Sequence, residues 1–296
     1  MIEISVVLPT YNRKESLREC LDSLFLQDFP REAYEVIVVD DGSTDGTGGI
    51  IKAGFPCRGV NLIYVRQDHK GVSAASNLGI RYSQGRIIGF TEDDCVVPSD
   101  WIRKIVYFHH RYEDLAIQGR ITNCYQDNLI AILEQTLNDA YLPYVLDEVN
   151  GNRYITLFSS GNSSFKMEIF QNYGVRFNEN LVICEDVDLS NQLIAKGLRI
   201  LYIEEIAVKH KHRVNISSFV KKHFFDGRWQ YLLRRFWHKD KRDYNTKKFS
   251  QVQFFLKLSF ANLKDYKTKG IILILLHIAR KSIRTSGYVF QKLVYK

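Results

Sequence analysis

Apolar stretches in the first hundred residues each end abruptly at a polar or acidic loop. Three of them span Ile2–Leu8, Glu35–Val39 and Arg86–Phe90, and a fourth apolar run spans 61–66. Their β-branched composition is typical of strands buried in a parallel sheet, and helical patterns of apolar residues separate them. This alternation predicts an α/β fold with a mostly parallel, Rossmann-like central sheet flanked by helices.

The loops that follow these strands contain the reactive polar residues. The first strand is followed by PTYNR (9–13), the second by DDGST (40–44) and the third by TEDD (91–94). Ligands of open α/β sheets bind at the carboxyl ends of the strands, so these loops are expected to line one crevice. Carboxylate oxygens are natural ligands of Mg²⁺ and Mn²⁺, which usually also bind substrate phosphates. One such cluster alone more often caps a helix, but the recurrence favours a ligand and metal site.

The second half of the chain continues the pattern with further candidate residues. Residues 101–150 look helical, a strand is expected at 154–158, and a helix is expected at 186–198. Glu185 and Asp186 at the start of that helix suit a general base. A strand from about 200 ends at His210, whose neutral imidazole can bind a metal ion.

Charge is unevenly distributed along the 296 residues, although the net charge is only +8. Residues 207–296 contain 22 Lys and Arg against four Asp and Glu, whereas the first 206 residues carry a net charge of −10. This asymmetry predicts an acidic domain at 1–215 and a basic, helical extension at 216–296. A basic extension indicates an anionic surface as its partner.

The extension interleaves aromatic with basic residues, as in FVKKHFFDGRWQYLLRRFW (219–237). Its last apolar run, Ile271–Ile278, is far shorter than the roughly 20 residues that span a bilayer. Aromatic and basic amphipathic helices are typical of the membrane interface, which is the interpretation we favour. The alternatives are helices that pack under the sheet, a nucleic-acid contact, and a dimer interface in a homo-oligomer.

Cysteine usage and the N-terminus bear on the compartment. The five cysteines are scattered and form no CxxC pair, which argues against a disulfide framework or a thiolate zinc site. Met1 leads directly into the first strand, without the pattern of a signal peptide. We therefore expect a cytoplasmic protein, peripheral on the cytoplasmic face of the membrane.

Seven motifs, taken together, resemble those of the family-two glycosyltransferases, which have the GT-A fold and invert the anomeric carbon. The resemblance covers about residues 1–215 and leaves the extension out. The motifs are VVLPTYNR (6–13), VVDDGSTDGT (38–47), GVSAASNLG (71–79), FTEDDCVVPSDW (90–101), SSGNSSFK (159–166), EDVDLSNQL (185–193) and AVKH (207–210).

The resemblance implies a role for each matching residue. The nucleobase would contact Tyr11, Asp41 and the backbone of Pro9, with Asp40 supporting the loop and Arg13 nearby. The remaining nucleotide contacts would come from Asp68, Asn77 and, at the ribose, Asp93. Gly161 and Asn162 would line the space for the donor sugar and the acceptor.

The same resemblance implies the catalytic and metal-binding residues. Asp186 would be the catalytic base, and Glu185 would contact acceptor or donor hydroxyl groups. Asp94 and His210 would bind Mg²⁺ or Mn²⁺, with His212 close enough to compete with His210. Glu92 stands where the family usually has the first aspartate of its DxD motif, so its part in metal binding is open.

A second departure from the family pattern is Ser76, where the family often has arginine. A contact to the diphosphate would then come from elsewhere, for instance from Lys70 or Arg66. The donor would be a nucleoside-diphosphate sugar, with UDP favoured over GDP or dTDP. The acceptor would be a glycan or a lipid-linked precursor of a surface polysaccharide.

Two other functions are alternatives to a glycosyltransferase. A sugar-nucleotide nucleotidyltransferase needs a glycine-rich loop after the first strand, whereas PTYNRKES (9–16) has no glycine. A non-catalytic adaptor for membrane or nucleic acid would explain the basic extension but not three acidic or polar strand ends. We therefore expect an enzyme and no nucleic-acid partner.

Overall fold

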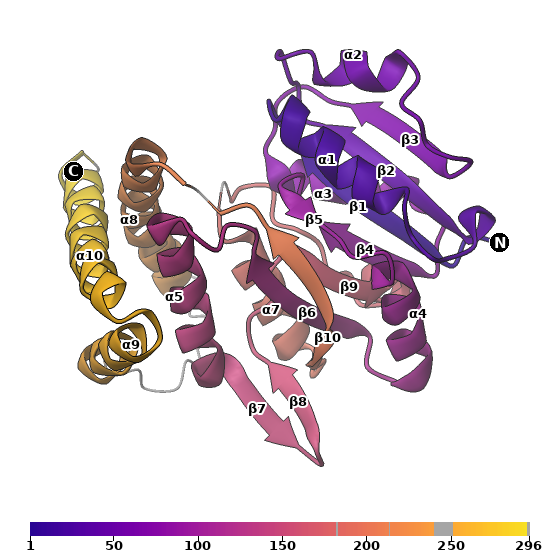
Figure 1. The fold of residues 1–296 in the computed structure, drawn as a ribbon. Coiled ribbons are helices and arrows are strands. Elements are labelled where there is room, and N and C mark those ends of the chain that lie inside the picture. The colour runs from indigo at the N-terminus through magenta and orange to yellow at the C-terminus, as the bar shows by residue number, and fades with distance from the viewer. Residues whose placement is uncertain (182, 213, 240–250, 295–296) are drawn as a thin grey trace. The chain divides into compact units, whose positions relative to one another are not determined.

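The computed structural model describes residues 1–181, 183–212, 214–239 and 251–294 (Figure 1). The chain forms two compact units. The first comprises Met1–Thr122 and Leu146–His210, and the second comprises Asn123–Val145 and Lys211–Lys296. Residues 240–250 of the expected basic extension lie outside the described residues.

One sheet organises the first unit, in the order β3-β2-β1-β4-β9-β6-β10-β8-β7, with β5 paired to β10. Strands β3, β2, β1 and β4 are parallel, whereas β9 runs antiparallel to both β4 and β6. The strands are β1 (Ile4–Thr10), β2 (Tyr34–Asp40), β3 (Asn61–Arg66), β4 (Ile87–Thr91), β5 (Cys95–Val96), β6 (Ala116–Asn123), β7 (Leu146–Val149), β8 (Asn152–Ile155), β9 (Asn162–Lys166) and β10 (Ile200–His210).

Helices cover both faces of this sheet, as its apolar strands require. Val36 and Val38 of β2 belong to the large core with α1 and α4, whereas Ile37 and Val39 pack with Ala75 of α3. Alternate residues of a strand face opposite sides of its sheet, so both faces are buried. The helical segments of this unit are α1 (Lys14–Leu24), η1 (Arg31–Ala33), α2 (Thr47–Lys52), α3 (Val72–Tyr82), α4 (Trp101–Arg111), α6 (Glu168–Asn172) and α7 (Glu185–Ala195).

The structure corrects the expectation that residues 101–150 are helical throughout. Helix α4 ends at Arg111, and β6 and β7 are strands within that range. Strand β9 follows the predicted strand at 154–158 and was not expected either. Both β6 and β9 bury polar or small residues, including Gln118, Ser163 and Ser164. A pattern of apolar residues therefore gave no signal for them.

Among the residues that the structure describes, the second unit contains four helices, α5 (Leu129–Val145), α8 (Ile216–Lys239), α9 (Gln251–Tyr266) and α10 (Thr268–Val294). Its core joins Leu133 and Leu137 of α5 to Phe219, Phe254 and Leu273. Helices α8 and α10 cross closely because Gly227 and Gly287 have no Cβ. At either position a Cβ would overlap the backbone of the other helix, at Arg284 or Phe224.

The domain boundary that the sequence suggests, between Asn215 and Ile216, remains a prediction. In the structure, α5 packs with the helices of the basic extension. Helix α5 contributes core residues that the sequence placed in the first domain. In the parts of the chain that the structure describes, none of the helices combines the length and apolar character needed to cross a membrane.

Candidate functional site

The carboxyl ends of β1, β2 and β4 line a cavity of about 630 Å³ in the first unit. Pockets for small ligands commonly have volumes of this order. The residues around it include six that the sequence predicted, namely Pro9, Tyr11, Arg13, Asp41, Glu92 and Asp93. Lys70, the suggested substitute for a missing arginine, also lines it.

Asp40 and Asp41 are both buried, and they hold two neighbouring loops. Asp40 accepts hydrogen bonds from the backbone N–H of Ser43 at 2.7 Å and from the hydroxyl of Tyr64 at 2.6 Å. Asp41 accepts hydrogen bonds from the backbone N–H groups of Lys70 and Gly71 at 2.8 and 2.9 Å. Asp41 therefore fixes the cavity wall formed by residues 67–71, and Asp40, at the end of β2, holds the loop at Ser43.

His69 is a component of this wall that the sequence analysis missed. Its ring stacks on Tyr11, with 4.1 Å between ring centroids, and its Nδ1 lies 2.7 Å from an Asp41 carboxylate oxygen. More than half of the His69 side chain is exposed. The signal for it in the sequence was weak, because a histidine in a polar loop is usually solvated.

Arg13 joins the end of β1 to the acidic residues after β4. Its Nη1 donates a hydrogen bond to Asp93 at 2.9 Å and another to Asp94 at 2.5 Å. Thr10 donates a hydrogen bond to the other Asp93 oxygen at 2.7 Å. Arg13 thus neutralises part of the charge on one buried and one half-buried carboxylate instead of lying free beside the cavity.

The two aspartates differ in acidity because their partners differ. Burial raises the pKa of Asp93 to about 6, although Arg13 opposes that rise. Burial alone would also raise the pKa of Asp94, but contact with His210 and the charges of His210 and Arg13 lower it to about 2. Asp94 is therefore the better anionic ligand at neutral pH.

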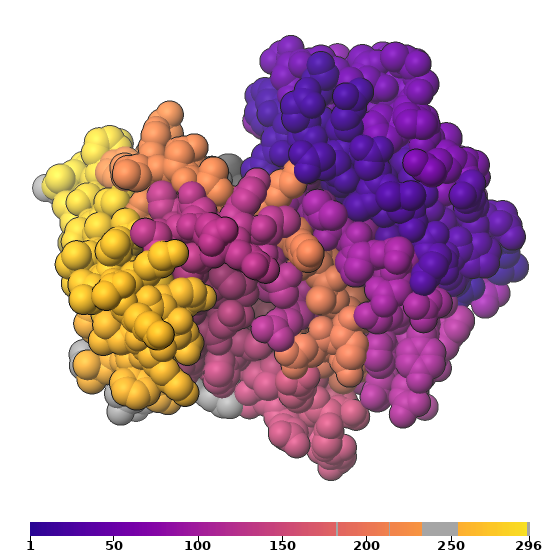
Figure 2. Space-filling model, viewed as in Figure 1, coloured from indigo at the N-terminus to yellow at the C-terminus, as the bar shows by residue number. Residues whose placement is uncertain are grey.

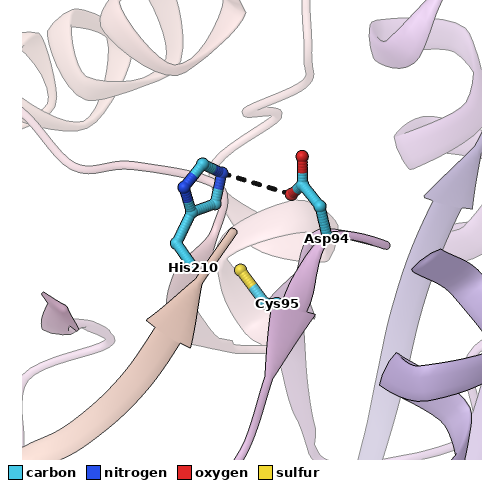
Figure 3. Close-up of side chains that lie close together, drawn as sticks. All are labelled: Asp94, Cys95 and His210. Carbon is cyan, nitrogen blue, oxygen red and sulfur yellow. Dashed lines mark ion pairs between the residues drawn. The ribbon is translucent and has the colours of Figure 1, made fainter. Parts of the chain in front are cut away.

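Pairing of β5 with β10 brings the predicted metal ligands together. His210 lies opposite Cys95 in this antiparallel pair, and its Nε2 is 3.2 Å from Asp94 Oδ1 (Figure 3). Side-chain ligand atoms of Asp94, Cys95 and His210 all lie within 4.8 Å of one another. Glu92 is next to this group, with its carboxylate 3.6 Å from His210 Nε2.

The donor atoms present fit a divalent cation. Asp94 Oδ1 is buried, and its contact among the described residues is the 3.2 Å ion pair with His210 Nε2, so both donor atoms face the same point. Carboxylate oxygens with one imidazole nitrogen suit Mn²⁺ or Mg²⁺, whereas a thiolate suits softer metals. Burial raises the pKa of the Cys95 thiol, which therefore keeps its proton. The Cys95 sulfur lies 3.8 Å from the carbonyl oxygen of Gly161.

His210 must lose a proton to become a ligand. Burial lowers its pKa, but the contacts with Asp94 and Glu92 more than compensate and raise the pKa to about 9. A cation bound there would displace that proton, so metal affinity is expected to increase with pH up to this value.

His212, the predicted competitor of His210, lies in the second unit, where its Nε2 is 3.3 Å from a side-chain oxygen of Gln135.

Glu185 and Asp186 occupy the first turn of α7, as the sequence predicted, and are half-buried. Burial and then the charge of Asp186 raise the pKa of Glu185 to about 8. Burial and the charge of Glu92 raise the pKa of Asp186 to about 6. Burial and neighbouring negative charge therefore raise the pKa of both carboxyls toward neutral pH, as in acid–base pairs of enzymes.

Besides Asp40, Asp94, His210, Glu185 and Asp186, whose places are given above, four more predicted residues do not line the cavity. Asn77 is buried. Its side-chain nitrogen donates a hydrogen bond to the carbonyl oxygen of Phe177, and its side-chain oxygen accepts one from the Phe177 N–H. Asp68 is exposed on the loop before His69. Gly161 lies beside Glu92, while the preceding Ser160 lines the cavity and donates a hydrogen bond to Glu92 at 3.0 Å. Asn162, the fourth, is fully buried.

Asn162 makes three buried hydrogen bonds: it accepts one from Trp101 Nε1 and donates to the carbonyl oxygens of Arg120 and Ile206. We expect Asn162→Ala to lower the free energy of unfolding by about 2–4 kcal/mol, because it leaves these groups unpaired. Chemical denaturation measures this change. Asn172→Ala, at an exposed position, should change it by less than about 0.5 kcal/mol. Normal stability with weaker donor binding would instead place Asn162 against the ligand.

Comparison with known proteins identifies the family. The sequence model of glycosyl transferase family 2 matches residues 5–174, more than half of the chain. The chain therefore belongs to this family, as its motifs predicted.

Curated relatives match parts of the chain as well. The chain is 38% identical over 102 residues, 34% of its length, to the glycosyltransferase AglE of Haloferax volcanii. It is 27% identical over 241 residues, 78% of its length, to the glycosyltransferase GlyA of Streptococcus pneumoniae serotype 4. The minor teichoic acid biosynthesis protein GgaB of Bacillus subtilis is 26% identical over 73% of this chain. The matched segments span a third or less of these three relatives, at 33%, 33% and 24%.

Solved structures confirm the α/β fold. The mannosyltransferase PcManGT from Pyrobaculum calidifontis, in complex with GDP-Man and Mn²⁺, superposes with a TM-score of 0.66 at 18% identity, covering 99% of this chain and 86% of that one. Residues 1–349 of TarS from S. aureus, in complex with UDP, give a TM-score of 0.56 at 19% identity, covering 90% and 73%. Both are GT-A neighbours, so the expected fold class is confirmed.

Proposed function

We propose that this protein is an inverting glycosyltransferase that moves a sugar from a nucleoside-diphosphate sugar to a hydroxyl group. The observation that carries the proposal is the convergence of Asp94 and His210 beside a cavity, with the Glu185–Asp186 pair close enough for Glu92 to affect both. Binding and proton-transfer groups are thereby present at one edge of the sheet.

The nucleotide of the donor would occupy the cavity at the ends of β1 and β2. Tyr11 provides an exposed aromatic face for the base, and Asp41 and the loop at 67–71 provide polar groups. UDP is the first candidate because a TarS structure contains it, and GDP and dTDP are the alternatives, GDP-Man being bound in PcManGT.

A divalent cation, Mg²⁺ or Mn²⁺, would be held by Asp94 and His210, with Glu92 as a further candidate ligand. Support comes from the donor set and from the Mn²⁺ in the PcManGT structure. Such an ion supplies positive charge where the departing diphosphate becomes negative. Asp93, already bonded to Thr10 and Arg13, would orient the ribose.

Proton transfer would fall to the acidic pair on α7. Ionised Asp186 takes the proton from the acceptor hydroxyl as its oxygen attacks the anomeric carbon from the face opposite the leaving group. Protonated Glu185 donates a hydrogen bond to an oxygen of the acceptor or donor. Attack from the opposite face inverts the configuration at that carbon.

The acceptor would be a glycan or a lipid-linked precursor of a surface polysaccharide. The names of two relatives support this class of acceptor. GgaB is a minor teichoic acid biosynthesis protein, and a relative from Methanococcus voltae is named as a glycosyltransferase for a dolichyl N-acetylglucosaminyl phosphate. Both names describe those proteins, and the acceptor of this chain is inferred from them.

A screen of nucleotides tests the proposed donor site. We expect one of UDP, GDP, dTDP and CMP to raise the thermal midpoint in the presence of Mn²⁺, since a ligand that binds only the folded state stabilises it. A response to one base would identify the donor. The adaptor hypothesis would gain support if none stabilised the protein and duplex DNA bound it in a salt-sensitive way.

The second unit would place the enzyme on the cytoplasmic face of a membrane. Leu256, Phe260 and Leu263 of α9 and Ile271, Leu275 and Ile278 of α10 are all exposed. The surface that these two helices contribute is drawn in gold to yellow in Figure 2. Their spacing of three or four residues puts each set on one face of its helix. Basic side chains on the same helices suit anionic lipid headgroups. A homo-oligomer interface is the alternative use of this surface.

Substitutions test the membrane surface better than deletion of 216–296, which would strip α5 of its core partners. We expect Phe260→Ser with Leu275→Ser to weaken binding to phosphatidylglycerol vesicles at least about tenfold, because two apolar side chains no longer insert. Co-sedimentation measures the loss. Leu26→Ser with Tyr107→Ser, at exposed positions of the first unit, is the control. Unchanged vesicle binding with a smaller mass in solution would assign the surface to an oligomer.

A further inference from the structure

The helices of the second unit enclose a separate cavity of about 610 Å³. Side chains of α5, α8, α9 and α10 line it, and three of them are the cations Arg280, Lys281 and Arg284 of α10. Tyr141 and Tyr288 add aromatic surface with hydroxyl groups. Positions 280, 284 and 288 follow one another at intervals of four and so share one face of the helix.

The two arginines are not fully paired with the protein. Their Nε atoms are buried and donate no hydrogen bond to any described residue. Adjacent like charges at this spacing repel, and native proteins rarely leave buried polar atoms unpaired. Burial, and then the charge of Arg284, lower the pKa of Arg280, and attraction to Glu134 and Asp226 opposes this only in part.

Nearby acids already contact other side chains. One oxygen of Glu134 lies 2.6 Å from Lys222 Nζ, and the other lies 2.7 Å from His223 Nε2. Asp226 lies 3.4 Å from the other nitrogen of His223. Both acids attract the arginines only at longer range. The cavity therefore has an excess of positive charge.

A further group near the arginines is uncharged. His277 of α10 is completely buried, and burial followed by the charges of Arg280 and Lys281 lowers its pKa to about 4. Neutral His277 stacks on Phe255, 5.6 Å between centroids. This arrangement leaves Arg280, Lys281 and Arg284 as the cations of the cavity wall.

We propose that this cavity binds a phosphate or diphosphate group, and that this group belongs to the acceptor. Guanidinium groups bind phosphate oxygens through paired, charge-assisted hydrogen bonds, and the lysine adds a point charge. The tyrosine hydroxyls can donate to the remaining oxygens. The assignment to the acceptor rests on the proposed glycosyltransferase function, whereas the phosphate site itself does not.

Inorganic pyrophosphate is the first probe, used with the full chain in EDTA so that the proposed metal-dependent donor site does not compete. We expect it to raise the thermal midpoint of the unchanged protein and of Asp94→Ala, but not of Arg280→Gln with Arg284→Gln. Arg284→Lys keeps the charge and loses the paired geometry, so it should bind about tenfold more weakly. Lys264→Gln with Lys292→Gln removes two exposed cations of α9 and α10 and is the matched control.

Ligand-free stability separates a binding role from a structural one. Because the arginine pair is repulsive, the double glutamine variant should unfold about 2–4 °C higher than the unchanged protein. A lower midpoint than the control would assign the arginines to the fold and overturn the proposal. Equal stabilisation of all variants by pyrophosphate, or no stabilisation of any, would overturn it as well.

Vesicles identify the source of the phosphate. If phosphatidic acid increases binding to phosphatidylcholine vesicles, and pyrophosphate or the double glutamine variant removes that increase, the phosphate is a lipid headgroup. If phosphatidic acid has no effect while pyrophosphate binds, the phosphate belongs to a soluble ligand. Stabilisation by pyrophosphate without any response to Mn²⁺ and nucleotide would retain the phosphate site and remove its link to an acceptor.

Discussion

Replacing Asp186 by asparagine should lower turnover at least about a hundredfold and leave nucleotide binding intact. General-base assistance is typically worth about 10²–10⁴-fold, and an amide cannot accept the proton of the acceptor hydroxyl. The side chain already accepts a hydrogen bond from the backbone N–H of Val187 at 2.8 Å, which an amide oxygen can keep. The fold is therefore expected to survive the change. Steady-state kinetics with the donor from the nucleotide screen measure the effect.

The pH profile provides a second test of the same residue. Because burial and Glu92 raise the pKa of Asp186 to about 6, the base becomes protonated and turnover falls as pH drops below that value. Glu205→Gln removes an exposed carboxylate of β10 and should leave turnover and profile unchanged. Near-normal turnover of Asp186→Asn would exclude Asp186 as the base.

Replacing Asp94 by alanine should abolish the stabilisation that Mn²⁺ and a nucleoside diphosphate give together. Mutation of residues that only hydrogen-bond to metal ligands lowers metal affinity about 10–100-fold, so removing a direct ligand should lower it at least about a hundredfold. Titration of Mn²⁺ in the presence of nucleotide measures the affinity.

Cys95→Ser is the informative companion, since Cys95 also lies within ligand distance of Asp94 and His210. A protonated thiol contributes little to Mn²⁺ binding, so this variant should bind the metal within a few-fold of the unchanged protein. A large loss in Cys95→Ser would make the cysteine a ligand. Normal Mn²⁺–nucleotide binding by Asp94→Ala would refute the role of Asp94.

The sequence predicted those parts of the site that depend on strand direction. Asp41, Asp93 and Pro9 follow apolar strands, and parallel strands bring their carboxyl ends to one edge of the sheet. Apolar, β-branched composition made β1, β2 and β4 easy to recognise. The cavity could therefore be located before the structure was known.

Residues whose position depends on antiparallel pairing or loop conformation could not be found in this way. Cys95 reaches His210 only because β5 pairs with β10, and a two-residue strand has no sequence pattern. His69 faces Tyr11 because Asp41 fixes the loop at 67–71. Asn162 matches a family motif, yet its amide is directed at Trp101. A match to a family motif therefore predicts where a residue lies better than it predicts the hydrogen-bond partner of that residue.

The late position of β10 in the chain has a consequence for synthesis. The loops after β1, β2 and β4 are complete by Asp94, whereas His210 is made more than a hundred residues later, at the end of β10. Domains fold as the ribosome releases them, so the nascent chain holds its acidic cluster before that histidine exists. Arg13 is then the cation that compensates Asp93 and Asp94. We expect these salt bridges to offset the repulsion between the two aspartates until β10 joins the sheet, when His210 completes the proposed site.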